Sequence, residues 1–144
     1  MMDPNILEIR EHTGVGFNRT LAFESWRVAL AHAAPYDRHP EDLREWQRHN
    51  ATDEVFCLLR GGCVLFTAGN GAQPGRIEAV VLEPLKLYNV RRGAWHARTL
   101  DEDSSVIIVE NDDTSAVNSD SSAMTPEQHE SMRTLSNALR GGTV

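Results

Sequence analysis

Two histidines and a glutamate are the side chains of this sequence best suited to chemistry, and all three stand where predicted strands begin. His49 and Glu54 straddle the stretch NATD, directly ahead of an apolar run that ends at two glycines. His96 follows Gly93 by three residues, where a turn again enters a strand. Imidazoles and carboxylates bind divalent metals or transfer protons. Taken singly, each is more typical of a polar strand start or, for His96 beside Trp95, of a buried histidine with satisfied hydrogen bonds.

The elements that must position these residues are predicted to be short β-strands. Apolar residues alternate over 21–33, which predicts one or two strands, although the alanines there also allow a helix. Pro40 favours a short helical turn from there to Trp46. The stretch EVFCLLRGGCVLFTAG has two apolar runs around a glycine turn, the pattern of a hairpin. Further strands are predicted within RIEAVVLEPLKLYNV, RRGAWHARTL and VIIVEN. Short strands recurring about every 8–12 residues are typical of a sandwich or barrel.

Past Asn111 the composition becomes polar, and a helix signal follows. Residues 113–124 are predicted to form a polar linker that leaves the β-domain of residues 1–112. Thr125 is suited to an N-cap, because proline follows it and a glutamine three residues on completes a capping box. We expect a helix over 125–140 that packs on the barrel or on a partner subunit.

Composition restricts the function classes. The chain has 144 residues, 40% hydrophobic and 24% charged, which is typical of one globular domain. Its net charge is −7, and nine acids but no lysine or arginine lie between Asp101 and Met132, which argues against nucleic acid as the main partner. No apolar run approaches the roughly 20 residues that span a bilayer, and the N-terminus lacks the plan of a signal peptide. We therefore predict a cytoplasmic protein with no membrane partner.

The two cysteines, Cys57 and Cys63, flank the glycine turn. A disulfide or a pair of metal thiolates is one interpretation. The favoured one is two small apolar residues on neighbouring strands of a hairpin, because a reducing cytoplasm disfavours disulfides and no second cysteine pair completes a zinc site.

The spacing of the histidines and glutamate resembles the two motifs of the cupin superfamily. The first motif runs Gly-x5-His-x-His-x3–4-Glu-x6-Gly, and His49, Glu54 and Gly61 match its second histidine, glutamate and closing glycine. The second runs Gly-x5-Pro-x-Gly-x2-His-x3-Asn, and Gly93 and His96 match its core. Stretches such as HNATDEVFCLL, KLYNV and VIIVEN also resemble a subgroup of small single-domain bacterial cupins, which implies no particular reaction.

The sequence also departs from these motifs. Gln47 stands where the first histidine is expected, and Glu41 where the leading glycine would be. Three further positions replace the glycine, proline and asparagine of the second motif: Leu85, Arg91 and Leu100. The resemblance covers about residues 20 to 112, so it includes the predicted hairpin between the motifs.

The resemblance implies an all-β fold, a cupin-type double-stranded β-helix or jelly-roll barrel, with short N-terminal strands and a C-terminal α-helix. In such a barrel, inward-facing residues of distant strands converge. His49, Glu54 and His96 would then form a two-histidine, one-carboxylate metal site for iron, manganese, nickel or zinc, with open positions for water or substrate. The amide of Gln47, on the same strand face as His49, is either a weak ligand or a hydrogen-bond partner of metal-bound water.

Other residues are predicted to line the mouth of this pocket. Tyr88 and Trp95 supply either an aromatic wall or core packing. Arg98 lies two residues beyond His96, and inside a barrel its guanidinium needs an anionic partner, either a protein carboxylate (Glu54 or Glu110) or a carboxylate substrate. The predicted catalytic residues are Glu54 and His96, and the predicted substrate-binding residues are Gln47, Tyr88, Trp95 and Arg98.

Three hypotheses of function remain at this level. The first is a metal-dependent enzyme on a small polar metabolite, with isomerase or lyase chemistry favoured over a dioxygenase because Gln47 weakens nitrogen ligation. The second is a binding module without turnover, which holds a small ligand. The third is a metal-free enzyme in which His96 or His49 acts as general base near Glu54. The resemblance, and the sheet edges that such barrels must cover, also imply a homodimer.

Overall fold

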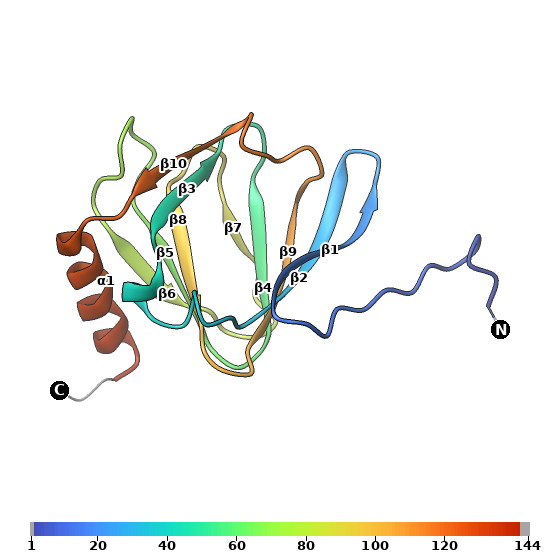
Figure 1. Cartoon of the computed structure of the whole chain (residues 1–144), viewed down its shortest axis with the longest axis horizontal. Coiled ribbons are helices and arrows are strands. Elements are labelled where there is room, and N and C mark those ends of the chain that lie inside the picture. Colours follow the sequence, from blue (N-terminus) through green and yellow to red (C-terminus); the bar gives the residue numbers. More distant parts are fainter. Residues whose placement is uncertain (1, 142–144) are drawn as a thin grey trace.

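Two five-stranded antiparallel sheets face one another in the computed structural model, which describes residues 2–141 (Figure 1). The first sheet has the order β1-β2-β9-β4-β7 and the second the order β10-β3-β8-β5-β6. The strands of the first sheet are β1 (Gly16–Phe23), β2 (Trp26–His32), β4 (Glu54–Arg60), β7 (Tyr88–Val90) and β9 (Ser105–Asn111). Those of the second are β3 (Glu45–His49), β5 (Cys63–Thr67), β6 (Glu78–Val81), β8 (His96–Leu100) and β10 (Ser119–Ala123).

The space between the sheets is filled at one end by apolar side chains. This inner core comprises Ala29, Ala31, Phe56, Leu58, Cys63, Leu65, Leu82, Val90, Leu100, Val106 and Ile108. Along β4 and β9 the buried positions alternate, since every second side chain of a strand points to the same face. The predicted jelly-roll architecture is confirmed, with two facing antiparallel sheets around one interior.

The C-terminal helix α1 (Pro126–Leu139) covers the outer face of the second sheet. Thr125 caps it through the predicted capping box with Gln128. Beneath the helix lies an outer core of Trp46, Val64, Phe66, Ala68, Trp95 and Met132. The Trp46 indole also donates a hydrogen bond to Oε1 of Gln128, with a distance of 3.1 Å, so the cap that starts the helix also docks it on β3.

The predicted hairpin around the glycine turn is wrong in its pairing. Strand β4 pairs with β7 and β9, while β5 pairs with β6 and β8, so Gly61 marks a corner between the two sheets. Gly61 has φ +79°, and a Cβ there would lie 2.7 Å from the Cα of Ser104, so only glycine fits the corner. Both cysteines are free thiols; Cys63 lies in the inner core and Cys57 is half-buried.

Three other segments differ from their predictions. The predicted linker of residues 113–124 contains β10, which pairs with β3 along its whole length. The predicted helical turn ends early: a 3-10 turn covers Pro40–Asp42, and the rest of that stretch enters β3. The first strand begins at Gly16, ahead of the expected alternating segment.

The first described residues, 2–11, are exposed, whereas His12 stacks on His32 of β2, with ring centroids 5.0 Å apart. The exposed segment runs away from the sheets (Figure 1), and Ile6 and Ile9 each expose 78% of their surface. Strand β1, which follows the segment, is the outermost strand of its sheet. Across residues 2–141, no helix has both the length and the apolar character needed to cross a membrane.

Candidate metal centre and pocket

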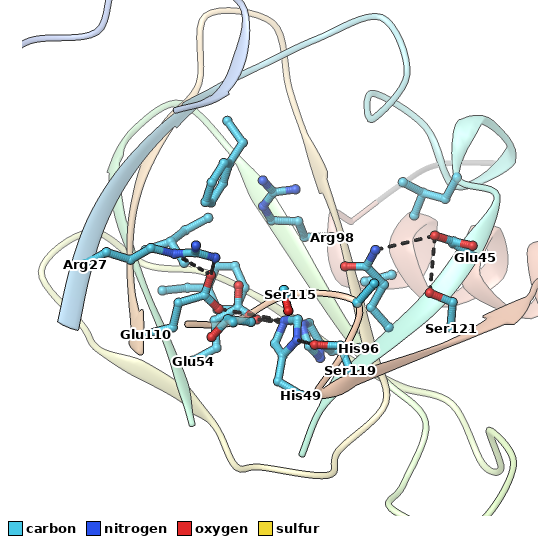
Figure 2. A pocket seen from close by; sticks show the side chains of 18 of the residues that line it. Arg27, Glu45, His49, Glu54, His96, Arg98, Glu110, Ser115, Ser119 and Ser121 are labelled. Carbon is cyan, nitrogen blue, oxygen red and sulfur yellow. Dashed lines mark hydrogen bonds and ion pairs between the residues drawn. The ribbon is translucent and has the colours of Figure 1, made fainter. Parts of the chain in front are cut away.

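A cavity of about 690 Å³ occupies the polar end of the space between the sheets. Figure 2 shows its side chains converging from strands of both sheets. Its charged side chains are Arg27, Glu45, Glu54, Arg98 and Glu110, and both histidines of the motifs face it. Ile108 and Phe56 form part of its apolar surface.

Strand β3 places His49 and Gln47 in the cavity, because alternate side chains of a strand point to the same face. Glu45, Gln47 and His49 line the cavity, whereas Trp46 and Arg48 lie on the opposite face of the strand toward the outer core. Gln47 thus points the same way as His49, as the two-residue spacing predicted. Its amide donates a hydrogen bond to Oε1 of Glu45 over 3.4 Å.

The loops that carry the two motifs are hydrogen-bonded to each other. The backbone N–H of Gly93 donates to the carbonyl of His49, at 2.7 Å, and Gly93 adopts φ +81°. Asp53 accepts from the backbone N–H of Arg92, at 2.8 Å, and from the Asn89 amide, at 3.0 Å. These bonds hold the start of β4 against the turn before β8, so residues distant in the sequence enter one site.

Three ligand atoms converge at this point. Glu54 Oε2 lies 2.8 Å from His96 Nε2 and 3.0 Å from His49 Nε2. The ligand atoms of these three residues all lie within 4.8 Å of one another. The three side chains are largely shielded from solvent, since the least buried of them, His49, exposes 12% of its surface. The structure therefore brings together the three residues that the motifs selected.

The hydrogen bonds on the far sides of the imidazoles orient them. His96 Nδ1 lies 3.0 Å from the carbonyl oxygen of Ala94, which can only accept, so this nitrogen carries the hydrogen. In the neutral imidazole, His96 Nε2 then presents a lone pair toward Glu54. His49 Nδ1 lies 2.8 Å from Oγ of Ser119, a hydroxyl that donates or accepts, so this contact orients the ring without assigning its tautomer. Contacts on the far side of the ring orient metal-binding histidines.

The arrangement leaves electron-rich atoms facing each other. Oε2 of Glu54 and Oε2 of Glu110 are buried and have no hydrogen-bond partner among the described residues. A neutral imidazole lone pair beside a carboxylate oxygen is repulsive unless a proton or a metal ion lies between them. The donor set of two imidazoles and a carboxylate fits a divalent transition metal.

Burial and the neighbouring charges shift the pKa values of Glu54 and His49. Burial alone would raise the pKa of Glu54, but in their protonated forms the two imidazoles donate to it and carry positive charge, which outweighs burial and holds that pKa well below its usual range. Burial likewise opposes the charged form of His49, yet the hydrogen bond and charge of Glu54 raise the pKa of its imidazole. Glu54 is therefore ionised at neutral pH, as a metal ligand must be.

Arg27 and Glu110 form a second pair; the sequence analysis considered Glu110 as a partner of Arg98 and did not place Arg27 in the site. Oε1 of Glu110 accepts from Nε of Arg27, at 3.2 Å, and from its Nη2, while Oε2 lies 3.8 Å from His49 Nε2. Burial, then the charge of Glu54, raise the pKa of Glu110. Arg27 could have been found from the alternation of β2, because it shares the parity of Ala29 and Ala31, which lie in the inner core.

Arg98 lines the cavity, but its predicted protein partners are wrong. Neither Glu54 nor Glu110 contacts it; the nearest carboxylate is that of Asp37, with Nη1 3.9 Å from Oδ2. That distance is too long for a hydrogen bond. The buried Nε of Arg98 has no partner among the described residues.

Tyr88 and Trp95 are not among the residues that line the cavity, and of the two predicted roles, aromatic wall or core packing, both side chains take the second. Trp95 lies in the outer core, with its indole donating to the carbonyl of Gly71, at 3.0 Å, and the Arg48 guanidinium over its ring, 4.4 Å from the centroid. Tyr88 packs against the inner core, and its hydroxyl accepts from the backbone N–H of Glu83, at 2.9 Å. Trp95 directly precedes His96, so strand alternation places the two on opposite faces.

No family model matches the sequence, and no curated protein matches it. Solved structures do match. The QdtA 3,4-ketoisomerase from Thermoanaerobacterium thermosaccharolyticum, in complex with TDP, has 14% identity and a TM-score of 0.54, over 68% of this chain and 67% of that one. Hydroquinone 1,2-dioxygenase from Sphingomonas sp. TTNP3, with 4-hydroxybenzoate bound, has 10% identity and a TM-score of 0.50, over 63% and 62%. A cupin-2 domain containing protein from Shewanella frigidimarina has 17% identity and a TM-score of 0.47, over 70% and 84%.

The ketoisomerase and the dioxygenase share this fold but carry out different reactions. At identities below 20% the likeness concerns the fold alone. The chain therefore has the cupin fold that its motifs predicted, and its function must be argued from the site.

Proposed function

We propose that this protein is a metal-dependent enzyme of isomerase or lyase type that acts on a small polar metabolite. The observation that carries the proposal is the convergence of His49 Nε2, His96 Nε2 and Glu54 Oε2 in a buried cavity, with no hydrogen-bond donor among the described residues for the carboxylate oxygen. A cation resolves the repulsion among these atoms. A divalent metal ion is the cation for which this donor set is suited.

A metal held by His49, Glu54 and His96 would supply Lewis-acid polarisation of a substrate carbonyl or hydroxyl. Iron, manganese, nickel and zinc all accept this donor set. The chain's own residues do the remaining work. Gln47, beside the ligands on β3, orients the substrate or a water molecule through its amide. We favour isomerase or lyase chemistry over oxygen-dependent cleavage because Gln47 replaces a nitrogen ligand.

A second candidate is a metal-free enzyme at the same residues. It is supported by the raised pKa of His49, since a protonated imidazole would also satisfy the Glu54 oxygen. His49 or His96 would then move a proton to or from the substrate. A binding module without turnover would use the same cavity and differ only in leaving its ligand unchanged.

The deciding measurement is the metal content of untagged protein, purified without chelator, by plasma mass spectrometry. We expect near-stoichiometric metal in the wild type and loss of that metal in both His49→Ala and His96→Ala. His39→Ala is the matched control, because His39 is exposed and outside the cavity. Absence of metal from the wild type, together with no uptake on titration, would contradict the metal-dependent proposal and favour the metal-free one.

Turnover is tested separately. The metal-loaded protein would be incubated in deuterated water with a panel of hydroxy acids, keto acids and sugars and followed by NMR, because isomerases and lyases exchange protons next to a carbonyl. Exchange that is lost in Glu54→Gln supports an enzyme. Binding of a panel member with no exchange and no conversion would support the binding module instead.

The proposal includes a homodimer in the cytoplasm. Its support is the exposed apolar N-terminal segment, where Ile6 and Ile9 are uncovered, next to β1 at the edge of its sheet. Exposed apolar surface and open strand edges are typical of subunit contacts. Light scattering after size exclusion should give twice the 16.1 kDa chain mass, and deletion of residues 2–12 should give the monomer. A monomeric full-length chain would contradict the dimer.

The proposed cytoplasmic location is supported by the two free cysteines, which fit a reducing compartment.

A further inference from the structure

Two arginines line the cavity, and they differ in how well their guanidinium groups are satisfied. Arg27 donates to Glu110 through Nε and Nη2, and its Nη1 lies 3.5 Å from the carbonyl oxygen of Asp112. Arg98 has no hydrogen bond of this kind, and its buried Nε has no acceptor among the described residues. In Figure 2 Arg98 stands apart from the Arg27–Glu110 pair and has no dashed line to another drawn residue.

The nearest carboxylate, that of Asp37, does not accept a hydrogen bond from the Arg98 guanidinium. Its Oδ2 lies 3.9 Å from Nη1, while its Oδ1 accepts the backbone N–H of Ala34, at 2.9 Å. The carbonyl of Asp37 is also fixed, by the N–H of Leu100 at 2.8 Å. Burial raises the pKa of Asp37 even with Arg98 nearby. Asp37 thus makes its hydrogen bonds with nearby backbone groups, and the N–H donors of the Arg98 guanidinium stay available for a ligand.

An unsatisfied guanidinium with 19% of its side chain exposed is costly to the fold. A planar, two-oxygen anion recovers that cost through paired, charge-assisted hydrogen bonds. The other charges of the cavity include the carboxylates of Glu45, Glu54 and Glu110, and Glu110 is matched by Arg27. One free guanidinium among these acids suits a singly charged carboxylate better than a phosphate.

Arg98 is also placed to act together with the metal-binding residues. It lies two residues beyond His96 on β8, and both side chains face the cavity. Two residues along a strand correspond to roughly 6.6 Å. A ligand that spans this separation needs one polar group at the histidines and a second, charged group a few carbon atoms away.

We propose that Arg98 binds a carboxylate of the substrate, so that the enzyme selects metabolites that carry a carboxylate beyond their metal-chelating group. The inference rests on the proposed function, because the chelating group is defined by the metal. Arg98 is then a specificity-determining residue, and substrates lacking the second carboxylate bind weakly.

Three hydroxy acids test this inference by calorimetry on zinc-loaded protein: lactate, malate and 2-hydroxyglutarate. All three carry the same 2-hydroxycarboxylate chelating group, and only the last two carry a second carboxylate. We expect at least one diacid to bind at least about tenfold more tightly than lactate. In Arg98→Gln that preference should disappear, while the affinities for lactate and for zinc stay unchanged. Arg76→Gln, an exposed arginine away from the cavity, should behave as the wild type.

The outcomes separate the two proposals. A wild type that takes up no zinc overturns the proposed function, and with it this inference as stated. Zinc uptake with equal affinity for lactate and both diacids, or with no binding of any of the three, overturns the inference alone, as does a preference that survives in Arg98→Gln. If Arg98→Gln does not fold, Arg98→Lys decides, because lysine keeps the charge but lacks the two-pronged geometry and should lose most of the preference.

Discussion

Three strands of the barrel carry a polar side chain at one end and an apolar one at the other, all directed into the space between the sheets. The polar ends are Glu54 on β4, His96 on β8 and Glu110 on β9, and the apolar ends are Leu58, Leu100 and Val106 on the same strands. We call these ends the mouth and the floor. Floor side chains satisfy one another by packing, whereas mouth side chains converge with carboxylate oxygens left unpartnered.

The difference indicates how one set of strands serves both stability and chemistry. The floor buries apolar area and stabilises the fold without any ligand. The mouth gathers charge that opposes folding until a cation or ligand neutralises it, as is common at functional sites. Substitutions at the mouth should therefore lower metal affinity with little loss of unfolding free energy, and substitutions at the floor should do the reverse.

The largest effect is expected at the mouth. Glu54→Gln removes the only charged oxygen among the three proposed ligands and should abolish metal binding. This loss of metal affinity is larger than the roughly 100-fold loss typical of removing a hydrogen-bond partner of a ligand. The free energy of unfolding of the metal-free protein should change little, because losing the contacts with the two imidazoles that lower the pKa of Glu54 is offset by relief of its repulsion with Glu110. Metal titration and urea unfolding measure the two quantities.

The matched control is Glu45→Gln, which neutralises another acid that lines the cavity but has no contact with the histidines. It should leave metal affinity within a factor of a few of the wild type. Equal losses in the two variants would mean that general charge in the cavity, rather than ligation by Glu54, governs metal binding.

At the floor, Leu58→Ala should lower the unfolding free energy and leave metal affinity unchanged. Leu58 is 2% exposed in the inner core, and its truncation should cost about 2–5 kcal/mol of unfolding free energy. Metal affinity per folded molecule should not change. The neighbouring Leu59→Ala tests the contrast, because that side chain is 48% exposed and should cost little. A metal affinity that falls with Leu58→Ala would show that floor and mouth are coupled.

An intermediate effect is expected where the mouth is supported from outside. Ser119→Ala removes the hydroxyl that lies 2.8 Å from His49 Nδ1, so the ring loses its orientation. Metal affinity should fall by about 10–100-fold, with little change in unfolding free energy. Ser122→Ala lies on the same strand but does not line the cavity, and should have no effect on metal affinity. Identical affinities for the two variants would exclude a role for the Ser119 hydroxyl.

The smallest effect lies outside both regions. Thr125→Ala deletes the side-chain cap of α1 and should cost about 1 kcal/mol of unfolding free energy. Metal binding should be unchanged, since the helix packs on the outer face of the second sheet. Thermal unfolding with and without metal checks both statements, and a changed metal affinity would show that the outer core transmits strain to the mouth.

The sequence predicted best where the signal was local. The helix start at Thr125 depends on contacts within four residues, and the structure has the same capping box. The alternation that placed Gln47 beside His49 is equally local. The same rule, applied to Trp95 next to His96, would have moved the tryptophan to the outer face.

The errors arose where pairing between distant segments decided the outcome. The two glycines between β4 and β5 look like a hairpin turn, yet the chain changes sheets there, because each strand finds better partners far away in the sequence. Strand β10 has the composition of a loop, SDSSA, and becomes a strand only because β3 offers a free edge. Intrinsic strand preference is weak beside such context.

The sequence by itself determined the fold class, the C-terminal helix and the three residues of the candidate metal centre, because alternation, capping and motif spacing are written in consecutive residues. Only the tertiary structure decided the partners of each charge. It matched Arg27 with Glu110, left Arg98 without a full partner and turned Trp95 outward. A charged side chain finds its partner through the packing of separate strands, and that packing depends on the whole chain at once.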